Sequence, residues 1–226
     1  MAEIGPIHHP EADLLLDYAA GKTSQAKSVL VATHLALCPA CRAEVRRYET
    51  VGGVLVEAET PAAMADDALA AVLARIDEGA GNDEPAAPAA PDLADPRTAR
   101  LIPQPLRGFL GAGLDSLPWK PRGVGIREAM LDFGDPGVRT SLVRIAPGGK
   151  VLAHTHGDIE TTMVLTGAFT DSTGRYARGD VATATADLDH KPVAEMTEEC
   201  LCLIMVEGGL RFTGPLTRLL NPLLRF

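Results

Sequence analysis

The sequence predicts a two-domain protein of the α + β class, in which a small helical half precedes an all-β half. Apolar residues recur at helical spacing up to residue 78, whereas later they form short β-branched runs separated by turn residues. A stretch rich in Gly, Pro, Ala and Asp lies between the two patterns. We therefore expect a helical domain over residues 1–78, a flexible linker over 79–99 and a β domain over 100–226. At 226 residues, the chain is long enough for each domain to have its own core.

Four helices are expected in the first half, each bounded by capping or breaking residues. The fourth helix carries an apolar stripe that packs either on its own domain or against a partner protein. The stripe consists of Leu69, Val72, Leu73 and Ile76. The expected helices are residues 10–20 stopped by Gly21, a segment capped by Thr23 or Ser24 that ends near Leu37, a segment opened by Pro39 and interrupted or frayed at Gly52–Gly53, and a segment opened by Thr60–Pro61.

A group of metal-competent side chains lies where the second expected helix ends. His34, Cys38 and Cys41 follow one side of that helix and its exit turn. Structural zinc takes four nitrogen or sulfur ligands in a tetrahedron, and His9 is the best candidate for the fourth ligand. His8 is the alternative, because two adjacent histidines do not readily serve one tetrahedral site. The competing interpretation is a histidine that lies by chance near two reduced core cysteines.

The second half contains short expected strands separated by turns, which is typical of a β-sandwich or barrel. A second group of ligand residues follows the pattern Gly148-x5-His154-x-His156-x3-Glu160-x6-Gly167. Residues two apart on a strand face the same side, so His154 and His156 are expected to point into one interior, where Glu160 and His190 join them. Such a site suits Zn²⁺, Fe²⁺ or Mn²⁺, and the alternative is histidines that are simply buried in a barrel. The clearest expected strands are Ser141–Ile145, Thr161–Leu165, Asp180–Thr183 and Cys200–Val206.

Cys200 and Cys202 share one face of the last of these strands. They are core residues, a redox-responsive pair or thiols near the metal. Neighbouring positions on one strand face are poorly placed for an unstrained disulfide with each other.

Charge and hydropathy narrow the function classes. The formal net charge is −9, and acidic residues outnumber basic ones most strongly before residue 79. This balance argues against direct nucleic-acid binding and favours a partner with a basic surface, although an ordinary acidic solvated face explains it equally well. The sequence has no apolar run long enough for a membrane span and no signal-peptide pattern, so we expect a cytoplasmic protein.

Two motifs together resemble one family over nearly the whole chain. The segment with His9, His34, Cys38 and Cys41 resembles the zinc-binding anti-sigma domain, and the His154–Glu160 motif resembles the first cupin motif. In this order they resemble the ChrR-type anti-sigma factors, which join such a domain to a C-terminal cupin barrel (jelly roll). The second cupin motif is kept only at Gly179 and His190. Its Pro, second Gly and Asn are replaced by Thr185, Asp187 and Ala194, which weakens the assignment of His190 as a ligand.

The resemblance implies a regulator rather than an enzyme. The helical domain would bind an extracytoplasmic-function (group IV) sigma factor as a 1:1 complex, and the barrel would help to release it on oxidative stress such as singlet oxygen. The rival hypothesis is a metal-dependent cupin dioxygenase with an accessory helical domain. The zinc-type motif of the first half favours the regulator, because such an oxygenase has no need of it.

Overall fold

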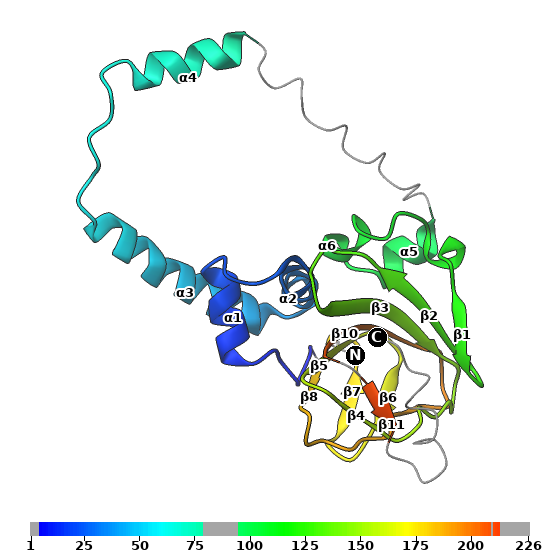
Figure 1. The fold of residues 1–226 in the computed structure, drawn as a ribbon. Coiled ribbons are helices and arrows are strands. Elements are labelled where there is room, and N and C mark those ends of the chain that lie inside the picture. The colour runs from blue at the N-terminus through cyan, green and yellow to red at the C-terminus, as the bar shows by residue number, and fades with distance from the viewer. Residues whose placement is uncertain (1–4, 79–94, 209, 213–226) are drawn as a thin grey trace.

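The computed structural model describes residues 5–78, 95–208 and 210–212 (Figure 1). Most of the expected linker and the last residues of the chain lie outside the described residues. The α + β class is confirmed, with helices first and an antiparallel β domain after them.

The first three helices follow the capping signals of the sequence closely. Helix α1 spans Ala12–Ala19 and α2 spans Gln25–Leu37, where the Ser24 side chain accepts a hydrogen bond from the Lys27 N–H. Helix α3 spans Pro39–Ala58 with Pro39 in its first turn. The expected interruption at Gly52–Gly53 is wrong, because α3 continues through both glycines. A glycine costs a helix only about 1 kcal/mol relative to alanine, which weakens the helix without ending it.

Helix α4 spans Ala68–Asp77 and starts later than the Thr60–Pro61 signal predicted. None of its residues is buried. Figure 1 shows it apart from α1–α3 and from the β domain.

Three short helical segments precede the first strand and were missed by the sequence pattern. They are α5 (Pro96–Leu101), α6 (Gln104–Arg107) and the 3-10 helix η1 (Leu114–Ser116). The Asp95 side chain caps α5 by accepting hydrogen bonds from the N–H groups of Arg97 and Thr98.

The β domain consists of three antiparallel sheets, and the four expected strands correspond to β3, β5, β8 and β10. The six-stranded sheet has the order β1-β2-β3-β10-β5-β8, the two-stranded sheet pairs β11 with β4, and the three-stranded sheet has the order β7-β6-β9. The strands are β1 (Lys120–Gly123), β2 (Ile126–Leu131), β3 (Val138–Ile145), β4 (His154–His156), β5 (Glu160–Thr166), β6 (Ala168–Thr170), β7 (Arg175–Ala177), β8 (Val181–Ala184), β9 (Val193–Ala194), β10 (Cys200–Glu207) and β11 (Leu210–Phe212).

Helix α2 belongs to two cores at once. Ala26, Val29 and Leu30 pack in the large core formed with α5, α6, η1 and one face of the six-stranded sheet. Val31, together with the partly buried Leu35, instead belongs to the small core of the helical half. An ion pair of 2.8 Å between Lys27 Nζ and Glu207 ties the same helix to β10. The expectation that each half has a separate core therefore does not hold for α2.

A second barrel core lies between the six-stranded and three-stranded sheets. Its buried residues are Ile145, Val164, Phe169, Tyr176, Ala194, Cys200 and Cys202. Among the described residues, no helix is both long and apolar enough to cross a membrane.

Candidate metal centres

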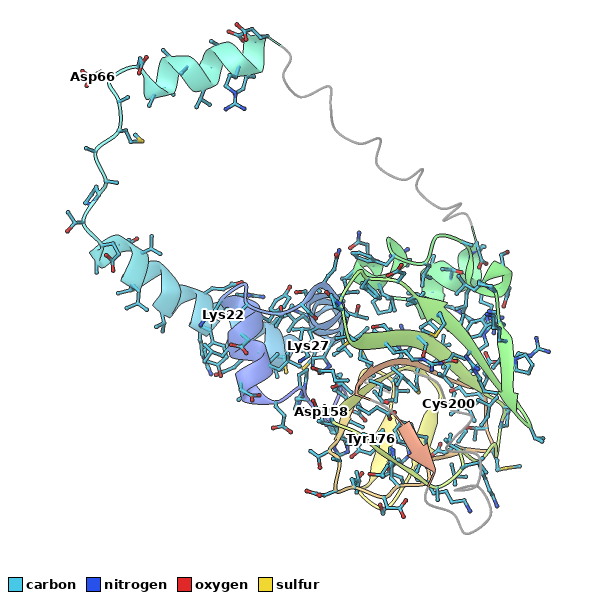
Figure 2. All side chains as sticks on the ribbon, viewed as in Figure 1. Lys22, Lys27, Asp66, Asp158, Tyr176 and Cys200 are labelled. Carbon is cyan, nitrogen blue, oxygen red and sulfur yellow. The ribbon has the colours of Figure 1, made fainter. Side chains whose placement is uncertain are left out.

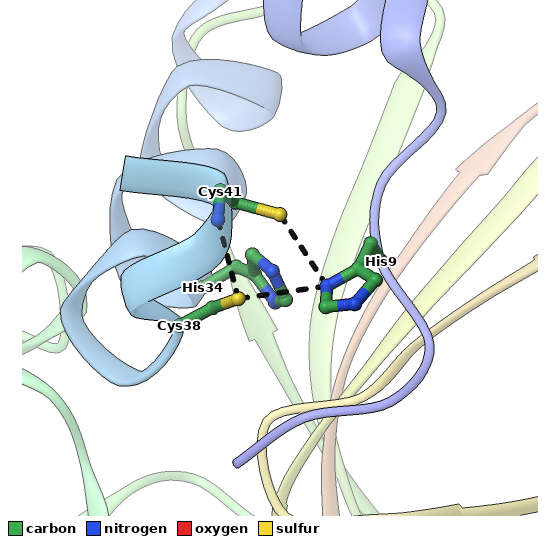
Figure 3. A group of neighbouring side chains, drawn as sticks. All are labelled: His9, His34, Cys38 and Cys41. Atoms are coloured by element: carbon green, nitrogen blue, oxygen red, sulfur yellow. Dashed lines mark hydrogen bonds between the residues drawn. The ribbon is translucent and has the colours of Figure 1, made fainter. Parts of the chain in front are cut away.

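The first centre brings together the four ligands expected from the sequence (Figure 3). One ligand atom from each of His9, His34, Cys38 and Cys41 lies within 4.8 Å of all the others. The Nδ1 atom of His9 is 3.5 Å from Cys38 Sγ and 3.3 Å from Cys41 Sγ. The His8 ring lies elsewhere, against Tyr176. The geometry therefore favours His9 over His8.

The protonation of His34 follows from its surroundings. Its ring is fully buried, and burial lowers its pKa, so the imidazole is neutral at pH 7. Its Nδ1–H donates a hydrogen bond of 2.8 Å to the Gly179 carbonyl. Its Nε2 is buried and has no hydrogen-bond partner among the described residues. The Nε2 lone pair is therefore left for a cation, in the arrangement typical of a metal-bound histidine.

The spacing and chemistry of the four residues fit zinc. Bonds of about 2.3 Å to sulfur and 2.0–2.1 Å to nitrogen place tetrahedral ligands about 3.5 Å apart, close to the His9–cysteine distances above. Burial, followed by the hydrogen bond with Cys38, raises the pKa of Cys41 to about 12. A cation at the centre would deprotonate such a thiol. Zn²⁺ held here would fix α1, α2 and α3 to one another.

The second centre lies inside the barrel and joins three expected ligands. His154, Glu160 and His190 come from β4, β5 and the segment before β9, and all three are buried. The Nε2 atoms of the two histidines face each other at 3.2 Å. The His154 Nδ1–H donates to the Leu152 carbonyl at 2.7 Å, and the His190 Nδ1 lies 3.2 Å from Asp171 Oδ2. These contacts orient both Nε2 lone pairs toward the centre.

The charges at this second centre also favour a cation. Burial lowers the pKa of His154 to about 4 and raises the pKa of Glu160 above its usual range. A divalent ion would compensate the buried carboxylate and accept both imidazole lone pairs. His156 lies on β4 by its backbone, but its side chain lies outside the described residues. Its assignment as a ligand therefore stays a prediction.

Cys200 and Cys202 are buried and free on β10, with their Sγ atoms 3.6 Å apart. The hydrogen bond with Cys200, followed by burial, raises the pKa of Cys202 far above its usual range. A buried neutral thiol reacts slowly with oxidants, so this environment favours a core role over a sensing role.

Sequence patterns did not reveal the residues that orient the ligands. The Gly179 carbonyl accepts a hydrogen bond from His34 although it lies far along the chain, and Asp171 contacts His190 from the β6–β7 turn. Burial alone would raise the pKa of Asp171, but hydrogen bonds from Thr173 and His190 hold it below its usual value. Their contacts depend on the barrel fold, which no local motif encodes.

The fold and the two centres define a helical half with one candidate metal site, joined to a β-barrel that holds a second one. Comparison with known proteins agrees. The family model described as the ChrR cupin-like domain matches residues 110–209. The anti-sigma-E factor ChrR of Cereibacter sphaeroides is 39% identical over 218 residues, which cover 96% of this chain and 98% of that protein.

A solved structure of an anti-sigma factor also matches most of the chain. The crystal structure of Rhodobacter sphaeroides SigE in complex with the anti-sigma ChrR is matched with a TM-score of 0.75 and 38% identity, covering 89% of this chain and 100% of the matched chain. A putative acetylacetone dioxygenase from Methylibium petroleiphilum is 21% identical with a TM-score of 0.38, covering 45% of this chain and 78% of that chain, and carries no argument about activity. The chain belongs to the ChrR family of anti-sigma factors. It is a regulator of that class rather than an enzyme.

Proposed function

We propose that the chain binds an extracytoplasmic-function (group IV) sigma factor in the cytoplasm as a 1:1 complex and keeps it inactive. The relative in the SigE–ChrR complex supports this partner class. The barrel would sense oxidative stress such as singlet oxygen and would promote release of the sigma factor. The helical half would supply the binding surface.

The observation that carries this proposal is the exposed apolar stripe of α4. Leu69 is 71% exposed and Ile76 is 68% exposed, although both belong to the apolar face of the helix. Val72 and Leu73 on the same face are each about half exposed. The end of α3 adds further exposed apolar residues, namely Val51, Val54, Leu55 and Val56. An apolar surface of this kind marks a protein–protein interface.

The length of α4 supports the same conclusion. Isolated helices shorter than about 12–15 residues are marginal in water, and α4 has 10 residues with none buried. A helix of this kind gains stability when its stripe is buried against another surface. A sigma factor bound between α4 and the end of α3 would provide that surface.

Charges around the stripe indicate the chemistry of the partner. Asp66 and Asp67 precede α4, and Asp77 and Glu78 close it, whereas Arg75 is its one basic residue. Asp66 projects from the segment before α4 in Figure 2. An acidic rim around an apolar stripe fits a partner with a basic rim, and it raises the association rate more than the affinity.

The two centres have different parts in this proposal. Zn²⁺ held by His9, His34, Cys38 and Cys41 would stabilise the small helical core from which α3 projects. A divalent ion, either Zn²⁺ or another such as Fe²⁺ or Mn²⁺, would be held in the barrel by His154, Glu160 and His190, with His156 as a further ligand. Any redox response of Cys200 and Cys202 would be a second input at the barrel.

A binding experiment with matched variants tests the proposal. We expect the wild-type protein to form a one-to-one complex with an extracytoplasmic-function sigma factor of the same organism, measured by gel filtration with light scattering and by calorimetry. Leu73→Asp should weaken binding by at least about 30-fold, because a central interface anchor contributes about 2 kcal/mol or more. Ala71→Asp, on the opposite face of α4, is the matched control and should bind like the wild type. Equal affinities of the two variants would contradict the assigned surface.

A further inference from the structure

The segment that carries His9 is held by the barrel. Asp180, which is only 2% exposed, accepts hydrogen bonds through Oδ1 from the N–H groups of Ile7 at 2.7 Å and His8 at 3.0 Å. The Val181 N–H donates to the His8 carbonyl at 3.1 Å, so the segment is hydrogen-bonded at the start of β8. Asp180 Oδ2 accepts a further bond from the barrel's own Ala177 N–H at 2.8 Å. The backbone next to His9 is therefore fixed by one buried carboxylate of the other half.

The same turn of the barrel also orients a second ligand. The β7–β8 corner, residues Arg178–Asp180, contains the Gly179 carbonyl, which accepts the hydrogen bond from His34 Nδ1–H. Gly179 has a φ of +91°, and a Cβ placed there would lie 2.6 Å from Pro6 Cγ. Only glycine permits this close approach between the corner and the N-terminal segment. Two of the four candidate ligands of the first centre thus depend on one corner of the barrel.

A chain of contacts joins this region to the second centre. His190 Nδ1 lies 3.2 Å from Asp171 Oδ2, and the Thr173 hydroxyl donates to Asp171 Oδ1 at 2.6 Å. The Thr173 hydroxyl also bonds to the Tyr176 hydroxyl at 2.9 Å. The Tyr176 ring contacts the His8 ring with centroids 4.5 Å apart. From a candidate barrel ligand to the neighbour of His9, each step is a direct contact.

From these contacts we propose that Asp180 and Asp171 are positioning residues that couple the two metal centres. A metal held in the barrel slows metal loss from the helical half and so raises the metal affinity of that half. By thermodynamic linkage, a metal in the helical half raises the metal affinity of the barrel by the same factor. Through these contacts, the metal state of the barrel would affect the helical half that binds the sigma factor. The regulatory role of this coupling rests on the proposed function.

Cobalt provides a probe that reports on the first centre alone. Thiolate ligands give bound Co²⁺ a charge-transfer absorption, and the candidate ligands of the barrel include no thiol. We would load the full-length protein with Co²⁺ in the absence of any sigma factor, add excess chelator and follow the decay of this absorption. The readout needs no sigma factor, so a failure of the coupling and a failure of sigma binding are distinguishable.

The first comparison concerns Asp180. Asp180→Ala removes the acceptor for Ile7 and His8, and it should speed Co²⁺ loss about 10-fold to 100-fold, the usual effect of removing a residue that orients a metal ligand. Asp180→Asn keeps an acceptor oxygen and should give an intermediate rate. If Asp180→Ala does not unfold cooperatively and is therefore misfolded, the rate of Asp180→Asn alone tests the role of Asp180. Asp132→Asn alters an exposed turn aspartate that accepts the Gly134 N–H at 2.9 Å, and as the matched control it should leave the rate unchanged.

The second comparison tests the connection between the centres. His154→Ala removes a barrel ligand and should speed Co²⁺ loss several-fold in the wild-type background. Tyr176→Phe keeps the ring against His8 but removes the hydroxyl bonded to Thr173. In this background, His154→Ala should have little further effect, which is a coupling measurable by a double-mutant cycle. Wild-type rates in both Asp180 variants, or independent effects of His154→Ala and Tyr176→Phe, would overturn the proposal.

Discussion

Removing the metal from the first centre should release α1 and α3 while α2 stays in place. Cys38→Ser is the sharpest perturbation, because it removes one ligand and leaves the barrel residues unchanged. Without the metal, the small core of the helical half retains three buried aliphatic side chains, those of Leu15, Val31 and Val45. At about 1.5–3 kcal/mol for each buried side chain, they contribute about 5–9 kcal/mol. Structural zinc contributes about 10–16 kcal/mol in small domains, so Zn²⁺ bound here would stabilise this half more than these three side chains do.

Helix α2 should respond differently because of its second core. Ala26, Val29 and Leu30 pack in the large core with the barrel and make no use of the metal centre, so they should stay packed when the metal is lost. The free energy of local opening should therefore fall for α1 and for the first turns of α3, but much less for α2.

Hydrogen exchange measured by mass spectrometry can resolve this difference between helices. A loss of only 3 kcal/mol would raise exchange in α1 about 100-fold. Peptides from β10 serve as an internal control and should exchange as in the wild type. Retained protection of α1 in Cys38→Ser, or equal loss from α1 and α2, would refute the reasoning.

The remaining predictions concern the shared core and the barrel. Leu30→Ala should lower the free energy of unfolding of the whole protein by about 2–5 kcal/mol in denaturant titrations, because Leu30 is fully buried against the barrel. A loss of stability confined to the helical half would contradict the shared core. Burial alone would raise the pKa of Glu128, but Arg139 helps to hold it below its usual value of 4.5. Glu128 therefore stabilises the fold above that pH and loses this effect as the pH falls. Glu128→Gln should lower the free energy of unfolding by about 1–3 kcal/mol at neutral pH and by less on acidification. A loss that does not depend on pH would argue against the ion pair. In thermal unfolding, Gly167→Ala should destabilise the protein more than Gly134→Ala. Both glycines have a positive φ, but only at Gly167 would a Cβ meet a backbone carbonyl oxygen, at a distance of 2.6 Å. Equal losses of stability would count against that contact.

Much of the helical half could be predicted because its signals are local. Ser24 and Pro39 mark helix starts through their own side chains. The spacing from His34 to Cys41 predicted three neighbouring candidate ligands, which lie at the end of α2 and in the first turn of α3. In the barrel, the spacing of the motif from Gly148 to Gly167 predicted that Glu160 joins His154 from the following strand, and the structure brings these two side chains together.

The rest depends on contacts between residues far apart in the sequence. The hydrogen-bond acceptor of His34 Nδ1–H is the Gly179 carbonyl, 145 residues away, and backbone carbonyls carry no sequence signature. The two-core role of α2 escaped prediction because both of its faces are apolar, and periodicity alone does not say what each face contacts. The late start of α4 also follows from context, since the Thr60–Pro61 signal has no packing to support a helix there.

The central claim is that the chain inhibits a sigma factor, and transcription in vitro tests it most directly. Core RNA polymerase, the sigma factor that forms the one-to-one complex and a promoter of that sigma factor would be combined with increasing amounts of metal-loaded protein. Transcripts should disappear near one equivalent of the wild-type protein, and Leu73→Asp should need a large excess to do the same. Undiminished transcription in the presence of excess folded, metal-loaded wild-type protein would contradict the claim.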